Sequence, residues 1–334
     1  MNTSNRKHFL LLGVLLLLAA LACNLPGITA NPPEQPTAQP VTQAPAATAT
    51  ATPLPTPTAT AVPSPTEELP TSTPKVSHVF VPPESVKLGK LIYDVVCVDT
   101  AAEQRAPYGD SYDINLFERP FTQDMTYIPD LDIASYNLGM DEKFYYVSIA
   151  LVGANPNNEI GIQYGVELDL DADGFGDYIV IAHPPYSVEW STDNVQVVRD
   201  TDHDTGGLSA EKSDAPLPGD GYDKIVFDGG RGPDDDDPDL AWVRVNAGKN
   251  ATVQFAFKRG LAENRFMFGV IADAGLKEIT DLDYVDRFTE EDAGSPIKGG
   301  PNYPLKKLFA VDNTCRTAQG FAGTGEEPQR CPLK

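Results

Sequence analysis

The sequence predicts an all-β protein, an antiparallel β-sandwich of the jelly-roll type over residues 76–290, with one short helix. A C-terminal extension, residues 291–334, is expected to be closed by a disulfide and packed on the sandwich, and a disordered linker precedes both. Two observations predict this class. About ten runs of 5 to 9 residues, rich in Val, Ile, Tyr and Phe, are separated by clusters of Gly, Pro, Asn and Asp. No stretch keeps helical spacing beyond two or three turns, which excludes a parallel α/β sheet.

The chain begins with a predicted lipoprotein signal peptide, residues 1–22. Arg6 and Lys7 precede an uncharged, Leu-rich run that is too short for a comfortable membrane span. The string "ALAC" at residues 20–23 resembles the bacterial lipobox, with Ala where Leu or Val is commoner. The resemblance implies that Cys23 is diacylated and anchors the chain on the extracellular face of the bacterial cell envelope. An ordinary signal peptide cut elsewhere is the alternative.

A linker is expected over residues 23–75. Residues 31–74 contain 12 Pro, 11 Thr and 8 Ala but no Lys or Arg, so there is almost nothing apolar to bury. Such a composition favours a disordered, polyproline II-like chain. We expect it to hold the folded part away from the membrane.

The net charge bears on the partners. It is −23 for the whole chain and −25 once the signal peptide has taken away Arg6 and Lys7. Nucleic acid and anionic lipid would repel such a domain, so no nucleic-acid partner is expected. The acidity fits the binding of cations or uncharged ligands, or it serves solubility only. The oligomeric state is left open.

Three cysteines remain once Cys23 carries lipid. Cys315 and Cys331 enclose a loop rich in Gly, Pro and Thr that has no core of its own, so a bridge between them is predicted. Cys97 would then be a small buried hydrophobic residue. Pairing of Cys97 with either of the other two is the alternative.

The predicted strands follow in chain order. The run at 143–153 is almost wholly apolar and reads as a central strand, whereas 251–257 places Val253, Phe255 and Phe257 on one face. A short helix is expected at 288–296, with Thr289 as N-cap, Asp292 in the capping box and Gly294 as its end. The predicted strands are 90–98, 131–138, 143–153, 162–170, 177–182, 194–199, 223–228, 241–245, 251–257 and 265–272.

An acidic loop lies between two of these strands, in "YGVELDLDADGFGDYIVIA" at 164–182. Asp169, Asp171, Asp173 and Asp177 take positions one, three, five and nine of a calcium-binding loop, with Gly174 at six. Position twelve is Val180 rather than Glu and the flanks are strands, so this is no EF-hand. We predict a calcium site grafted on a hairpin. The alternative is a solvated turn, because Asp-Gly is also a preferred hairpin turn.

A second acidic loop, "RDTDHDTGG" at 199–207, repeats the pattern with Asp200, Asp202 and Asp204. It is a second candidate site, or it donates a missing ligand to the first. The acid run at 232–240 is more typical of a solvated loop.

The segments "DLDIASYNLGMDEKFYYVSIAL" (130–151), "YGVELDLDADGFGDYIVIA" (164–182) and "ATVQFAFKRGLAENRFMFGVIAD" (251–273) together resemble strand pairs of the carbohydrate-binding-module-9-like and DOMON-like sandwiches. The resemblance covers residues 85 to 275 approximately, and it implies the sandwich fold more than a ligand. It lacks an obvious pair of exposed sugar-stacking tryptophans, since the chain has only Trp190 and Trp242.

No nucleophile, phosphate-loop or metalloprotease motif occurs in the chain. Glu167, Asp169 and Asp171 resemble the catalytic strand of laminarinase-type glycosidases, but the last Glu of that pattern is Asp here. We therefore expect a surface lipoprotein that displays a calcium-stabilised, non-catalytic module for extracellular glycan or polysaccharide. A glycoside hydrolase and a purely structural or adhesive protein are the alternatives. The candidate residues for stacking on a sugar are Tyr186, Trp190 and Trp242, and packing in the core is the alternative for each of them.

Overall fold

The computed structural model describes residues 76–107, 118–205, 221–230, 237–281, 288–328, 330 and 331. The described residues belong to one compact unit. The expected signal peptide, Cys23 and the linker up to residue 75 lie outside the described residues, as does most of the acid run at 232–240.

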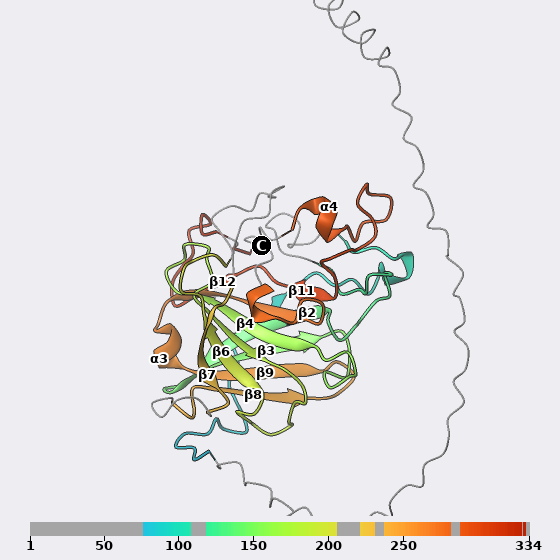
Figure 1. Ribbon diagram of the computed structural model, residues 1–334. Coiled ribbons are helices and arrows are strands. Elements are labelled where there is room, and N and C mark those ends of the chain that lie inside the picture. The colour runs from blue at the N-terminus through green and yellow to red at the C-terminus, as the bar shows by residue number, and fades with distance from the viewer. Residues whose placement is uncertain are drawn as a thin grey trace, which may run out of the picture. The chain divides into compact units, whose positions relative to one another are not determined.

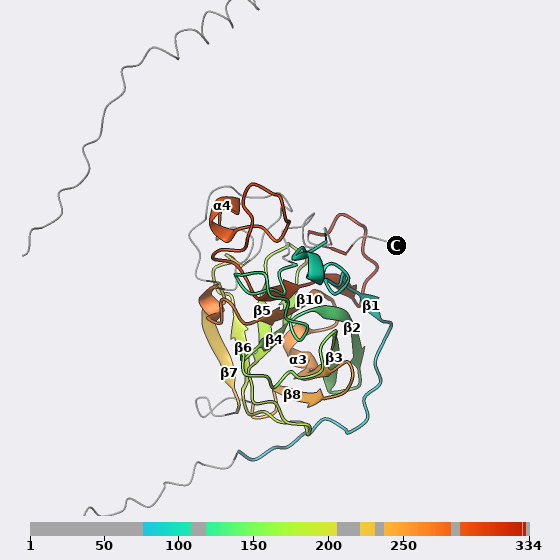
Figure 2. The ribbon, with the colours of Figure 1, turned by 90° about the vertical axis from the view of Figure 1, so that its right-hand side faces the viewer.

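Two antiparallel sheets stack face to face, which confirms the predicted sandwich (Figures 1 and 2). The strands of the first sheet are β1 (Ile92–Tyr93), β2 (Ile133–Met140), β3 (Phe144–Leu151), β8 (Ala241–Asn246) and β9 (Thr252–Lys258). The strands of the second are β4 (Gln163–Asp169), β5 (Tyr178–Ala182), β6 (Val195–Arg199), β7 (Lys224–Asp228), β10 (Phe266–Asp273), β11 (Val311–Asn313) and β12 (Thr317–Gln319). The first sheet has the order β1-β2-β3-β9-β8 and the second β11-β10-β4-β5-β6-β7, with β12 also paired to β10.

The core lies between the two sheets and follows from alternation along the strands. Val253, Phe255 and Phe257 of β9 point into it, as their spacing predicts, and they meet Val166 and Leu168 of β4 in one buried cluster. Burying one such side chain stabilises the fold by about 1.5–3 kcal/mol. The two inner faces therefore hold the sheets together.

The predicted short helix is present as α4 (Glu290–Ala293). The Thr289 hydroxyl accepts a hydrogen bond from the backbone N–H of Asp292 (3.1 Å) and donates one to its carboxylate (2.7 Å), as a capping residue does. Ala293 packs with Ile179 and Ile271, so α4 covers part of the outer face of the second sheet. Within the described residues, the other helical turns are η1 (Ala101–Glu103), α3 (Arg259–Ala262) and η2 (Ile279–Asp281).

The C-terminal extension is more closely integrated than predicted. Its strands β11 and β12 both pair with β10, so the extension completes the second sheet at that edge. Such three-residue strands are too short to show alternation in the sequence.

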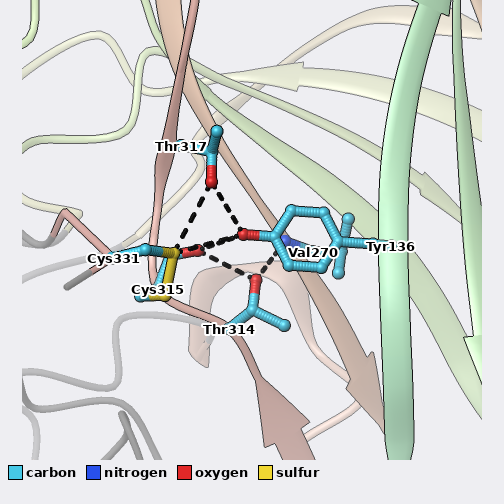
Figure 3. Close-up of a disulfide and its surroundings, with 6 residues drawn as sticks. All are labelled: Tyr136, Val270, Thr314, Cys315, Thr317 and Cys331. Atoms are coloured by element: carbon cyan, nitrogen blue, oxygen red, sulfur yellow. Dashed lines mark hydrogen bonds between the residues drawn. A yellow bond between two sulfur atoms is a disulfide. The ribbon is translucent and has the colours of Figure 1, made fainter. Parts of the chain in front are cut away.

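The predicted disulfide joins Cys315 to Cys331, and the alternative pairings are not formed because Cys97 is free and buried. Figure 3 shows how Tyr136 reaches this bridge from β2 in the other sheet. Its hydroxyl lies 2.9 Å from the carbonyl oxygen of Cys315 and 3.3 Å from Sγ of Cys331. The disulfide is thus tied to both sheets.

The strand predicted at 90–98 is much shorter than expected, because only Ile92 and Tyr93 pair with β2. Further along, the backbone N–H of Cys97 donates to the carboxylate of Asp132 (3.0 Å) instead of to a strand carbonyl. A side chain therefore replaces the sheet ladder there.

Candidate cation-binding loops

The first acidic loop joins β4 to β5 and is organised by Asp169, the last residue of β4 and fully buried. Its Oδ1 accepts a hydrogen bond from the N–H of Ala172 (2.7 Å), and its Oδ2 accepts one from Gly174 (3.0 Å). Ala172 has φ +62°, a left-handed conformation that is unusual for a residue other than Gly. The loop therefore turns tightly around one carboxylate.

Three of the four predicted ligands meet in this loop. One carboxylate oxygen from each of Asp169, Asp171 and Asp177 lies within 4.8 Å of the others. Two oxygens bound to one calcium ion at about 2.3–2.6 Å lie at most about 5 Å apart, so the spacing is compatible with a shared ion. Asp173 is not part of this group, and its Oδ1 accepts the N–H of Phe175 (2.9 Å).

The second acidic loop follows β6 and repeats the same turn around Asp200, which is 3% exposed. Oδ1 of Asp200 accepts the N–H groups of Asp202 (3.1 Å) and His203 (2.8 Å), and Oδ2 accepts that of Thr205 (2.9 Å). His203 has φ +61° at the same position in the turn as Ala172. Oxygens of Asp200, Asp202 and Asp204 again lie within 4.8 Å of one another.

The two loops lie side by side. The N–H of Gly176 donates to the carbonyl of Thr205 (2.7 Å), and the N–H of Asp200 donates to that of Asp177 (3.0 Å). The ring centroids of Phe175 and His203 are 6.3 Å apart. The predicted sites therefore form one acidic surface at the end of β4, β5 and β6, with each loop contributing its own group of three carboxylates.

Arg316 distinguishes the first loop from the second. It is almost fully buried, and its Nη1 lies 3.1 Å from Oδ2 of Asp169 and donates to the carbonyl of Gly174 (2.9 Å). Burial raises the pKa of Asp169, and the guanidinium and the two loop N–H groups oppose that shift only in part. Burial likewise raises the pKa of Asp177.

Sequence reasoning did not identify Arg316 as part of this site. It lies 147 positions after Asp169, directly after Cys315 of the disulfide, and its carbonyl accepts the N–H of Cys331 (2.8 Å). Only its place beside a predicted half-cystine hinted that its position would be fixed. The pairing with Asp169 arises from the fold and from no local pattern.

The side chains of the strand that resembles a glycoside hydrolase site make contacts within the fold. Glu167 is 6% exposed and its Oε1 accepts the hydroxyl hydrogen of Tyr222 (3.0 Å). Asp169, two residues on, is bound by Arg316. Two of the three carboxylates of the laminarinase-type pattern, Glu167 and Asp169, are thus engaged in the interior, whereas the third, Asp171, is exposed.

The predicted stacking residues lie mainly inside the fold. Tyr186 is 5% exposed, with its hydroxyl 2.7 Å from the carbonyl of Ile162, and Trp242 is 2% exposed under the ring of His78. Neither ring offers a face to solvent, which counts against the predicted role. Trp190 is half-buried, and the guanidinium of Arg244 lies 4.4 Å from its ring centre.

Asp239, at the end of the acid run, holds the segment that follows the linker. Its Oδ1 lies 3.0 Å from Nδ1 of His78, and its Oδ2 accepts the N–H groups of Val79 (2.9 Å) and Phe80 (2.7 Å). Asp237 is paired with Lys258. These two described acids of the run therefore have structural contacts.

Comparison with protein-family models, with curated proteins and with solved structures gave no match. The resemblance to carbohydrate-binding-module-9-like and DOMON-like sandwiches thus stays a prediction. Among the described residues, no helix has the length and apolar character needed to cross a membrane.

Proposed function

We propose that this chain is a surface lipoprotein whose β-sandwich is a non-catalytic binding module stabilised by calcium at the two acidic loops. The observation that carries the proposal is the duplication of one turn. Asp169 and Asp200 each accept backbone N–H groups three and five residues ahead, and each is grouped with two further carboxylates. Carboxylates gathered in this way repel one another. A divalent cation bound between them attracts each carboxylate, and this attraction outweighs the repulsion.

The donor set favours calcium over other divalent cations. The three grouped side chains in each loop are all carboxylates. The middle one, Asp171 or Asp202, is exposed, so water molecules can supply the remaining ligands of a calcium ion. Zinc prefers nitrogen and sulfur donors, and magnesium requires shorter, near-octahedral geometry.

The test is differential scanning calorimetry of the purified chain in EDTA and again after calcium is restored. Calcium should raise the melting temperature by several degrees, since an ion at a hundred times its dissociation constant stabilises by about 2.7 kcal/mol. The Asp171→Asn, Asp202→Asn double variant changes only exposed residues and should lose most of that shift. If wild type and double variant melt alike in EDTA and in calcium, the loops are solvated turns.

Placement at the cell surface rests on the sequence, because residues 1–75 lie outside the described part. The Cys23→Ser variant should leave the membrane fraction if that cysteine carries the lipid. Unchanged membrane association of Cys23→Ser would contradict the lipid anchor.

Extracellular glycan is the ligand class we propose for the module, on the basis of the sandwich fold and the expected surface display. With Tyr186 and Trp242 buried, Trp190 beside Arg244 is the remaining aromatic candidate for sugar contact. A glycan array should give signals that Trp190→Ala reduces. Absence of any glycan binding would favour a structural role, and polysaccharide hydrolysis abolished by Glu167→Gln would favour an enzyme.

A further inference from the structure

The outer face of the first sheet, which points away from the core between the sheets, has a covered part. The chain before β1 runs along the outside of this sheet, past β8 and towards β1 (Figure 2). Val86 and Leu88 of that segment pack on Tyr146 of β3 and Trp242 of β8. Both aromatic residues are 2% exposed. This part of the face is therefore closed to a ligand.

A row of polar side chains crosses the same face next to the covered part. The register pairs Arg244 of β8 with Gln254 of β9, and Gln254 with Ser148 of β3. Nε of Arg244 donates to Oε1 of Gln254 (2.8 Å), and Nε2 of Gln254 donates to Oγ of Ser148 (3.4 Å). Ser148 is 7% exposed, whereas Arg244 and Gln254 are half-buried. The row therefore reaches solvent over β8 and β9.

Arg244 is fixed at its guanidinium and still has donors to spare. Gln254 holds its Nε, and the guanidinium carbon lies 4.4 Å from the ring centre of Trp190, which is cation–π distance. Within the described part of the chain, its two terminal amino groups, Nη1 and Nη2, have no acceptor. A planar pair of N–H donors held in one orientation is suited to two neighbouring oxygen atoms of a ligand.

Trp190 positions Arg244 and does not itself present an open ring face on that side. The guanidinium of Arg244 covers one face of the ring, and the indole N–H donates to the carbonyl of Pro83 (2.9 Å). The ring of Tyr146 lies next to it, with the two centroids 6.3 Å apart. Replacing Trp190 should therefore weaken glycan binding by releasing Arg244.

The charges around Arg244 bear on the kind of glycan that fits. Burial lowers the pKa of Arg244, and the exposed carboxylates of Glu189 and Glu84 oppose that shift only in part. An acidic sugar would meet these two carboxylates and a chain of net charge −23, which repel it. The hydroxyl groups of an uncharged sugar accept hydrogen bonds from a guanidinium and donate them to a carboxylate. The surroundings therefore favour an uncharged glycan.

We propose that Arg244 determines the ligand specificity of the module, and that the ligand is an uncharged glycan with two neighbouring hydroxyl oxygens bound by Nη1 and Nη2. Gln254 and Trp190 are the positioning residues of this contact. The inference rests on the proposed glycan-binding function and assigns it a place on β8, in the first sheet. The acidic loops belong to the second sheet, so glycan binding and calcium binding can be measured separately.

The test is an array of oligosaccharides of glucose, mannose, xylose and galactose, next to oligosaccharides that contain uronic acids, probed with the full chain. Uncharged members should bind, and titration calorimetry with the best of them gives the affinity. Arg244→Lys keeps the charge but loses the planar pair of donors, so it should weaken binding about tenfold, as expected for one charge-assisted hydrogen bond. The matched control is Arg199→Lys in β6, an arginine beside the ring of Tyr178 (5.8 Å), which should bind like wild type.

Gln254 provides a second readout, which a merely structural role would not move. Gln254→Leu removes the acceptor of Nε and should weaken binding, whereas Gln254→Glu keeps an acceptor and should restore it. Should Arg244→Lys fail to fold, this pair decides alone. Weaker binding by Gln254→Leu that Gln254→Glu restores supports the proposal, and equal binding by both overturns it.

The outcomes separate this inference from the function on which it rests. Wild-type affinity of Arg244→Lys, or binding of uronic-acid glycans only, overturns the role of Arg244 and leaves the glycan-binding module standing. Absence of binding to any member of the array overturns both. The rise of the melting temperature in calcium should be the same in wild type and in Arg244→Lys, because the loops lie in the other sheet.

Discussion

The two acidic loops have the same backbone turn and different charge environments. In both, a buried Asp accepts N–H groups three and five residues ahead, and a left-handed residue, Ala172 or His203, stands at the same place. In the first loop, Asp169 also pairs with the buried guanidinium of Arg316 at 3.1 Å. In the described part of the second loop, up to Thr205, the donors to Asp200 are backbone N–H groups.

The backbone turn of each loop and the charge that compensates its buried Asp therefore have separate origins. The Asp-x-Asp-x-Asp spacing is local and produces the turn in both loops. The compensating charge in the first loop depends on the tertiary fold, because Arg316 comes from the disulfide-closed end of the chain. We therefore expect the first loop to be ordered partly by Arg316 and the second to depend more on a bound ion.

The largest expected effect follows from Arg316→Gln. In EDTA this change leaves Asp169 as an uncompensated buried charge and should cost about 3–5 kcal/mol of unfolding free energy. In saturating calcium the cost should be smaller, because an ion at Asp169 takes over part of the compensation. Urea unfolding in the two conditions measures both values.

The matched control for Arg316→Gln is the double variant with Asp169→Asn, which removes both charges of the pair. A double-mutant cycle then isolates the coupling between them. A loss for Arg316→Gln that is equally large in EDTA and in calcium would show that Arg316 does not substitute for an ion.

A smaller effect is expected from comparing Asp171→Asn with Asp202→Asn, which remove the exposed middle carboxylate of each loop. Full occupation of one site at a hundred times its dissociation constant is worth about 2.7 kcal/mol. Asp202→Asn should remove the larger share of calcium's stabilisation, because Arg316 already compensates the charge of one carboxylate, Asp169, in the first loop. Calorimetry with and without calcium measures the two losses. A larger loss for Asp171→Asn would reverse the comparison.

The sandwich could be predicted from the sequence because strand alternation is local. The run containing Val253, Phe255 and Phe257 shows which face is buried without knowledge of its neighbours. The prediction failed at 90–98, where the N–H of Cys97 binds the side chain of Asp132, 35 positions away. An apolar run shows the propensity for a strand and not whether a partner strand exists.

The candidate sites divide in the same way. The Asp spacing indicated both loops, but it also included Asp173, which turns to the N–H of Phe175 instead of joining the group. The contact between Arg244 and Trp190 had no sequence signal, since only the fold brings these residues together. For Trp242 the sequence left sugar stacking and core packing open, because an aromatic residue in a strand gives the same pattern in both cases, and the structure places it in the interior.

The smallest effect expected here concerns pH and tests whether protons replace calcium in the ion-free chain. Burial raises the pKa of Asp169 and Asp177 in the folded state, and it raises the pKa of Asp132 to about 6, from a value of 3.8. A carboxyl whose folded pKa lies above its unfolded pKa favours folding when protonated. In EDTA its contribution to stability is therefore gained as the pH falls through the folded pKa and is lost as the pH rises again. For the fully buried Asp132, acidification from pH 7 to 5 should raise the free energy of unfolding by an amount on the order of 1 kcal/mol.

Calcium needs ionised carboxylates, so its stabilisation should shrink over the same interval. Melting temperatures from pH 7 to pH 5 measure the calcium-minus-EDTA difference, and Asp177→Asn, which removes one of the titrating groups, should flatten it. A difference that stays constant over this range would mean that Asp169 and Asp177 neither bind calcium nor exchange it for protons.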